Sequence, residues 1–126
     1  MSTRADKENT KSIDKLCQVI STLTEHIDKE LQLQQIRLFL FVAQEQQAKR
    51  KPSTNCIAES LNMPQGSVSR NTKVMGIWKD TKGVVRGMDV IKSEPDQFER
   101  RRLVYSLTEH GEDVLKRISD IVSSHN

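Results

Sequence analysis

The sequence has few of the residues that build disulfide-bonded, metal-binding or membrane-spanning proteins. It holds two cysteines and three histidines in 126 residues, and Cys17 and Cys56 lie far apart, outside any CxxC pair. This spacing argues against a disulfide framework or a zinc site. The longest apolar run, residues 38–43, is far shorter than the roughly 20 residues that cross a bilayer. We expect two buried or half-buried thiols, no metal and no cofactor.

The sequence also lacks the signatures of a secretory leader and of common active sites. Residues 1–11 are polar and mixed in charge, unlike a secretory signal, so we expect a cytoplasmic protein. No glycine-rich phosphate loop follows a predicted strand, and neither cysteine has a credible base partner. The histidines, His26, His110 and His125, lie apart without metal-ligand spacing. The sequence therefore predicts a protein that is not an enzyme.

Positive charge is what the middle of the chain does have. The net charge of +3 is modest, but residues 49–86 carry eight basic and only two acidic residues. The segments on both sides are neutral or acidic overall. A basic centre between such ends is typical of a face that binds a polyanion. A solvated basic surface without a partner is the alternative on charge alone.

The two ends of the chain predict helices that pack together. Residues 1–10 are polar and are predicted to be disordered. Residues 11–31 carry apolar side chains at alternating spacings of three and four, which is a heptad seam. A C-terminal helix, residues 108–124, is predicted to begin at a Thr108 cap. The seam favours a dimer, with packing along the chain's own C-terminal helix as the alternative. The expected interface comprises Ile13, Leu16, Ile20, Leu23, Ile27, Ile118, Ile121 and Val122.

Residues 33–107 follow the order of a winged helix-turn-helix. Leu33–Gln47 is apolar nearly all round, as in a central core helix. A short helix at residues 55–61 and a tight connection lead to a polar helix, which begins at Pro64 and runs to about Gly76. Strands at residues 88–92 and 102–107 enclose the loop 93–101 as a hairpin. We expect a mainly α fold with a small β-hairpin, in one domain at residues 11–126.

The polar helix and the hairpin carry the functional prediction. Apolar contacts at Ala58 and Val68 seat the polar helix and turn its other face outward. Gln and Arg pair with adenine and guanine edges in the major groove, and Ser and Thr contact phosphates. Hairpin arginines suit the minor groove, and Glu99 is expected to orient one of them. The predicted DNA-binding residues are Ser53, Thr54, Pro64, Gln65, Gly66, Ser67, Ser69, Arg70, Lys73, Arg100, Arg101 and Arg102.

Residues 33 to about 115 resemble the MarR family of transcriptional regulators. The resemblance lies in residues 33–40, in residues 57–61 with 66–70, and in residues 99–111, which look like the family's wing signature. It implies a dimer built from N- and C-terminal helices, on a palindromic site. It places Gln65, Ser67, Ser69 and Arg70 on the recognition helix, and Arg101 on the wing beside Arg100. The chain departs from the family at Glu99, where the signature has aspartate, and at Asn71, where an apolar residue is usual.

These observations predict a sequence-specific transcriptional regulator of double-stranded DNA. We expect a homodimer that acts as a repressor on a palindromic operator. The resemblance implies that many members bind a small-molecule effector between the dimer helices and the DNA-binding lobe, and the short C-terminal helix of this chain argues against such a pocket. Two alternatives stay open: a replication, partition or architectural DNA-binding protein of a mobile element, and a winged helix that binds other proteins.

Overall fold

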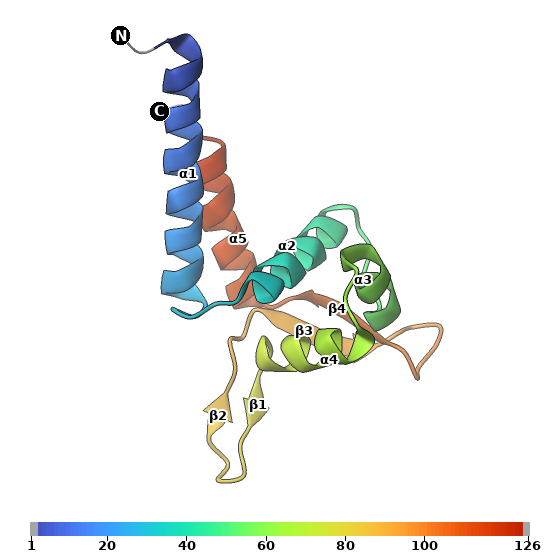
Figure 1. Ribbon diagram of the computed structural model, residues 1–126. Coiled ribbons are helices and arrows are strands. Elements are labelled where there is room, and N and C mark those ends of the chain that lie inside the picture. The colour runs from blue at the N-terminus through green and yellow to red at the C-terminus, as the bar shows by residue number, and fades with distance from the viewer. Residues whose placement is uncertain (1–2, 125–126) are drawn as a thin grey trace.

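The computed structural model describes residues 3–124, and it confirms the expected mainly α architecture with a small hairpin (Figure 1). His125 lies outside the described residues. The elements in chain order are α1 (Arg4–His26), α2 (Leu33–Gln47), α3 (Thr54–Leu61), α4 (Gln65–Val74), β1 (Trp78–Lys79), β2 (Val85–Arg86), β3 (Ile91–Pro95), β4 (Leu103–Leu107) and α5 (Glu109–Val122).

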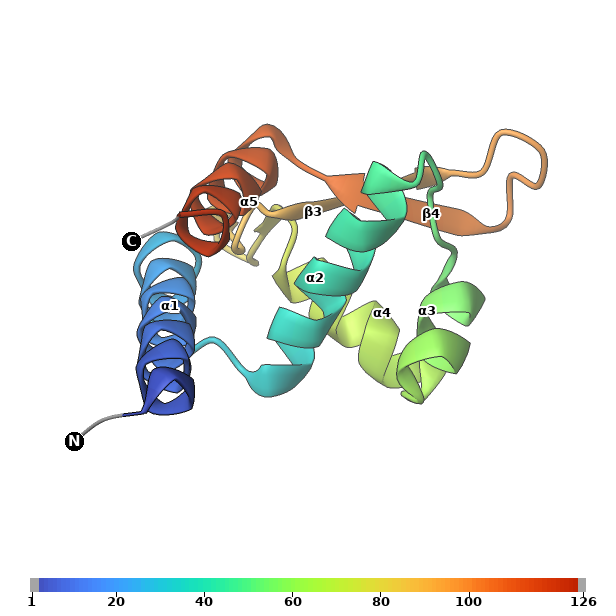
Figure 2. The ribbon, with the colours of Figure 1, turned by 90° about the horizontal axis from the view of Figure 1, so that it is seen from above.

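Helix α2 is the centre of the fold. Its residues Leu38, Phe39 and Val42 have no solvent exposure, as the apolar sequence of the helix predicts. Helices α3 and α4 and strand β4 all pack against it, while α1 and α5 lie toward its other side (Figure 2). The helix-turn-helix and the β3–β4 hairpin are therefore held by one shared core.

Helix α1 begins at Arg4, seven residues earlier than predicted, so the expectation of disorder over residues 1–10 is wrong from Arg4 onward. Thr3 and Asp6 form a capping box: the Asp6 N–H donates to Thr3 Oγ1 at 3.1 Å, and the Thr3 N–H donates to Asp6 Oδ2 at 3.2 Å. Such a cap satisfies backbone donors at a helix start without any apolar residue. Met1 and Ser2 lie outside the described residues. The helix ends at His26, short of the predicted residue 31.

Helix α1 packs along α5, and this corrects two of the predicted interface residues. Leu23 has no exposure and Ile118 is 7% exposed, because both lie in the protomer's own core. Ile27 is also partly buried against that core. The seam is open further up the helix, where Ile13 and Leu16 are exposed. Between residues 3 and 124 no helix is both long and apolar enough to cross a membrane.

The hairpin β3–β4 begins three residues later than predicted. The backbone of residues 88–90 is bonded to the end of α4: the Met88 N–H donates to the Val74 carbonyl at 3.0 Å, and the Val90 N–H to the Met75 carbonyl at 2.8 Å. The antiparallel register runs from Ile91↔Leu107 to Pro95↔Leu103, with residues 96–102 as the tip. A second two-stranded sheet, β1–β2, was not predicted.

The start of α5 is fixed at a very close contact. Thr108 caps the helix as predicted, since its Oγ1 accepts from the Gly111 N–H at 3.0 Å. Gly111 itself lies against the Val90 carbonyl oxygen, which is 2.3 Å from the position that a Cβ would occupy. Only glycine allows the helix to approach the backbone this closely.

Candidate nucleic-acid interface

Helix α4 buries one face and exposes the other. Val68 and Thr72 form its buried face, and the Thr72 hydroxyl donates to the Val68 carbonyl at 2.7 Å. The opposite face is exposed along its length and carries Gln65, Gly66, Ser69, Arg70 and Lys73. The structure thus brings the predicted recognition residues together on a single surface, with Ser67 half-buried at its margin.

The first turn of α4 has no side-chain cap. Pro64 is the N-cap, one residue outside the helix that it was predicted to begin, and its extended backbone has φ −61° and ψ 144°. Because proline offers no side-chain acceptor, the first backbone N–H groups of the helix are left for an external partner. Such a helix terminus favours anions.

Arg70 lies back along that first turn. Its Nη1 is 3.3 Å from the position that a Cβ on Gly66 would occupy. The guanidinium therefore lies over the N-terminal half of α4, where a recognition helix approaches base edges most closely. Gln65 is already engaged, because its Nε2 donates to Asn55 Oδ1 on α3. It must leave this bond to contact a base.

Asn71, the polar departure from the family pattern, is held by hydrogen bonds. Its Nδ2 donates to the Ser67 carbonyl at 2.9 Å, and its Oδ1 accepts from Gln35 Nε2 at 3.4 Å. Gln35 is buried in α2 and also accepts from the Gln32 N–H at 3.0 Å. A polar link between α2 and α4 therefore stands where an apolar contact is usual.

Ser53 and Thr54 use their hydroxyls inside the protein. Ser53 caps α3, with its Oγ accepting from the Cys56 N–H at 3.2 Å. Thr54 Oγ1 lies 3.0 Å from the Tyr105 hydroxyl on β4. Both residues are half-buried. Their clearest role in the structure is to fix α3 against the hairpin.

The tip of the β3–β4 hairpin is ordered by Asp96, and this corrects the predicted role of Glu99. Asp96 accepts from Arg102 Nε at 3.1 Å and from the Phe98 N–H at 3.0 Å. Glu99 forms no ion pair within residues 3–124. It contributes its carbonyl, which accepts from the Arg102 N–H at 2.9 Å. The charge of Arg102 is thereby paired with that of Asp96. Arg100 and Arg101 are exposed and have no acidic partner in the described part of the chain.

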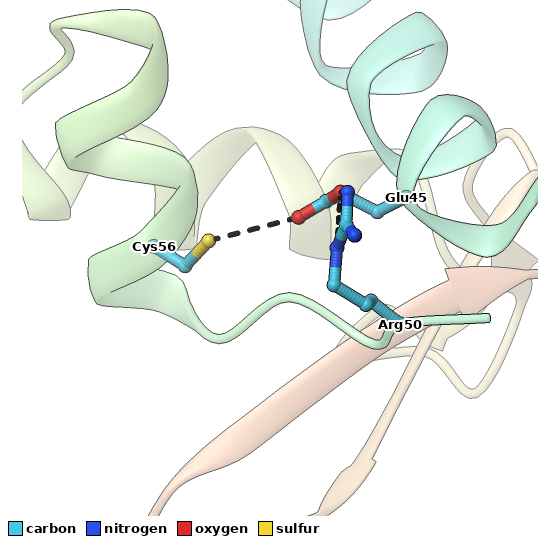
Figure 3. A network of polar contacts seen from close by, with 3 residues as sticks. All are labelled: Glu45, Arg50 and Cys56. Carbon is cyan, nitrogen blue, oxygen red and sulfur yellow. Dashed lines mark hydrogen bonds and ion pairs between the residues drawn. The ribbon is translucent and has the colours of Figure 1, made fainter. Parts of the chain in front are cut away.

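Three of the eight basic residues of segment 49–86 form ion pairs within the protein, so their charges are already matched. Arg50 donates through Nε at 2.9 Å and Nη2 at 2.6 Å to Glu45 Oε2, and this hydrogen bond raises the pKa of Arg50 (Figure 3). Lys51 pairs with Glu94, and Arg86 pairs with Asp80. Among residues 3–124, the basic residues of segment 49–86 that form no ion pair are Lys49, Arg70, Lys73, Lys79 and Lys82.

The two thiols do not share one environment. Cys56 is half-buried, with its Sγ 4.0 Å from Glu45 Oε1 (Figure 3). Cys17 is exposed on α1, so the expectation of two buried or half-buried thiols is wrong for this residue. Cys17 lies beside the apolar seam of α1 and is not part of it, so the seam gave no reason to expect this thiol to be buried.

An open groove of about 540 Å³ separates α4 from the β3–β4 hairpin. Sequence reasoning missed it, because its walls come from segments that are far apart in the chain. It places the cations of Lys73 and Lys92 on its two sides. Its other polar lining residues include Thr54, Ser69, Thr72 and Ser93.

Comparison with known proteins gives structural relatives only. No protein-family model matches the chain, and no curated protein does. Among solved structures, S. aureus MepR bound to ethidium bromide has a TM-score of 0.65 at 17% identity and covers 96% of this chain and 76% of its own. The S. aureus MepR–DNA complex has a TM-score of 0.57 at 18% identity, covering 94% and 77%. The adhesin competence repressor AdcR of Streptococcus pyogenes has a TM-score of 0.52 at 19% identity, covering 87% and 69%.

These neighbours are winged-helix regulators of the MarR type. At this level of identity, what they establish is the fold. The predicted resemblance is confirmed in that sense, over nearly the whole chain.

Proposed function

We propose, taking a MarR-like winged-helix fold as the premise, that this chain is a sequence-specific regulator that binds double-stranded DNA. It acts as a repressor, as a homodimer on a palindromic operator. The observation that carries the proposal is the exposed face of α4. There Arg70 lies over an uncapped helix start, and Arg100 and Arg101 extend unpaired from the neighbouring hairpin. Repression follows from occupancy of an operator, which requires no surface beyond the one that binds DNA.

The residues divide into those that read bases and those that bind phosphates. Arg70 reads a guanine edge, and Gln65 reads an adenine edge once its Nε2 leaves Asn55 Oδ1. Ser69, Lys73 and the first N–H groups of α4 bind phosphates, with Ser53 and Thr54 at the margin. One DNA backbone follows the groove between α4 and the hairpin, where Lys73 and Lys92 face it. Arg100 and Arg101 enter the adjacent minor groove, where the negative potential is strongest.

The dimer uses the open part of the α1 seam. Ile13, Leu16 and Ile20 are 58%, 64% and 48% exposed. Val122 of α5 is 58% exposed, and its carbonyl accepts from Lys15 Nζ of α1 at 3.3 Å. Burying these side chains against a second copy removes apolar surface from water. Ile121, which is half-buried and precedes Val122 on α5, belongs to the same proposed interface. The two-fold axis sets the half-sites about one helical turn, roughly 10 bp, apart.

Selection from random duplex DNA tests the whole proposal. The expected result is an enriched inverted repeat whose half-site centres lie about 10 bp apart. Binding at low salt without any enrichment would instead indicate an architectural protein. No complex at all would remove DNA as the partner.

Single substitutions in α4 separate base reading from phosphate binding. Arg70→Ala should cost about 1–3 kcal/mol per lost base contact and relax the preference at one position of each half-site. Lys73→Ala should weaken all sequences alike and lower the salt slope by about 0.9 per contact. Fluorescence anisotropy with labelled duplexes measures both effects. The matched control is Lys116→Ala on the exposed side of α5, which should bind as the parent protein does. Unchanged affinity in both Arg70→Ala and Arg101→Ala would favour a protein-binding winged helix.

A further inference from the structure

The β1–β2 hairpin is a separate arm of the molecule. It follows the C-terminal end of α4 directly and projects away from α1 and α5, on the side of α4 opposite α2 (Figure 1). Its two strands pair only with each other, Trp78 with Arg86 and Lys79 with Val85. Residues 81–87 are all exposed. The proposed function above does not use this arm.

The base of the arm is fixed to α4. The Met88 N–H donates to the Val74 carbonyl at 3.0 Å, and the Asp89 N–H donates to the Gly76 carbonyl at 3.1 Å. Gly87 has φ +107°, and a Cβ there would lie 2.0 Å from the Gly76 carbonyl oxygen. These contacts close the arm directly onto the last turn of α4. A duplex that receives α4 therefore meets the arm in a set orientation.

The tip of the arm is ordered and cationic. Asp80 Oδ1 accepts from the N–H groups of Lys82 and Val84 at 2.9 and 3.0 Å, and Asp80 Oδ2 accepts from Arg86 Nε at 3.0 Å. The Val84 hydrogen bond leads the causes that hold the pKa of Asp80 below its ordinary value. The Asp80 charge is thus matched by Arg86, and the amines of Lys79 and Lys82 form no ion pair within residues 3–124.

We propose that the β1–β2 hairpin is a third DNA-contacting element, in which Lys79 and Lys82 bind backbone phosphates beside the major groove that α4 enters. The inference rests on the proposed function, because it needs α4 at the duplex. Charge complementarity and continuity with the α4 surface both point to DNA. The arm extends from the end of α4 that lies nearer α1 and α5, whereas the tip of the β3–β4 hairpin lies on the far side (Figure 1). With the dimer axis at α1 and α5, the arm therefore lies nearer the centre of the operator than that tip does. There it contacts phosphates between the two half-site centres.

A protein partner is the other possible occupant. Val84 and Val85 are 48% and 62% exposed, and Ile77 near the base is 62% exposed. These side chains would dominate a protein interface. The two free lysines would dominate contact with a duplex. The test therefore removes the charges and leaves the apolar side chains in place.

The experiment compares three double variants of the full chain on the selected operator. Lys79→Ala/Lys82→Ala should lower affinity at 0.1 M salt by about tenfold or more, and lower the salt slope by about 0.9 per lost contact. Lys79→Arg/Lys82→Arg should restore most of the affinity, because arginine also binds phosphate. The matched control, Lys7→Ala/Lys11→Ala, removes the same charge at the far end of α1 (Figure 1). It should bind as the parent protein does.

Hydroxyl-radical footprinting locates the contact. Protection between the half-site centres should be lost in the alanine variant and kept in the arginine and Lys7/Lys11 variants. If the alanine variant binds with parental affinity, slope and footprint while Lys73→Ala weakens binding, the arm does not contact DNA and the proposed function stands. If the parent protein binds no duplex, both proposals fail. Circular dichroism of each variant confirms that the fold is retained.

Discussion

Ile20→Asp is expected to leave this protein monomeric and to lower its operator affinity by about 100- to 10,000-fold. Ile20 lies on the open part of the α1 seam, where a two-fold axis would bring it close to the same surface of a second copy. A carboxylate buried there loses its hydration and gains no partner. Each monomer then binds one half-site, and the second recognition helix no longer binds as part of the same molecule.

The measurement is molar mass by light scattering, followed by titration of the operator. Gln18→Asp is the matched control, since it introduces the same charge on the exposed, opposite side of α1. It should stay dimeric. Leu23→Asp cannot serve this purpose, because Leu23 lies in the protomer's core and its replacement would unfold the chain. A parent protein that is itself monomeric, or an Ile20→Asp variant of dimeric mass, would contradict the proposed interface.

Gly111→Ala should destabilise the fold by about 3 kcal/mol, at the upper end of what overpacking costs. The added methyl would lie 2.3 Å from the Val90 carbonyl oxygen, and this backbone atom cannot move aside like a flexible side chain. Val90 is also bonded at both ends, to Met75 through its N–H and to Thr108 through its carbonyl. Separating α5 from this segment would therefore disturb the connection between α4 and the hairpin.

Thermal unfolding tests this prediction against a glycine in a different setting. A loss of about 3 kcal/mol corresponds to a melting temperature roughly 10 °C lower for a chain of this size. Gly66→Ala should do the opposite and stabilise α4 by up to about 1 kcal/mol, because alanine favours helix. Only the mobile end of Arg70 lies near the new methyl, at 3.3 Å. Equal melting temperatures for the two variants would show that the Val90 contact is not as close as the structure has it.

The parts of the fold that were predictable depend on local pattern. The bounds of α2 follow from its apolar sequence, and the Thr108 cap follows from its position before the last helix. The exposed face of α4 was predictable because Val68 marks its buried side. In each case the signal lies within one turn or two of the residue concerned.

The parts that were missed depend on contacts across the chain or on polar signals. The helix over residues 4–10 is started by a Thr3–Asp6 cap, which an apolar periodicity does not reveal. Leu23 and Ile118 repeat the heptad spacing of their neighbours, yet they are buried because α1 meets α5 there. The β1–β2 arm has strands of two residues each, too short for an alternating pattern. Arg102 forms its ion pair with Asp96, six residues away, and not with the nearby Glu99, because the loop closes on itself.

Trp78 is the only tryptophan in the sequence, and it lies at the root of the β1–β2 arm. Its indole Nε1 is buried, with no acceptor in the described part of the chain. Indole emission is sensitive to polarity and to nearby charge. Its wavelength and its quenching by acrylamide therefore report on this one place without any dye. A titration of the unlabelled protein with duplex DNA would therefore report binding at the β1–β2 arm separately from binding at the β3–β4 hairpin.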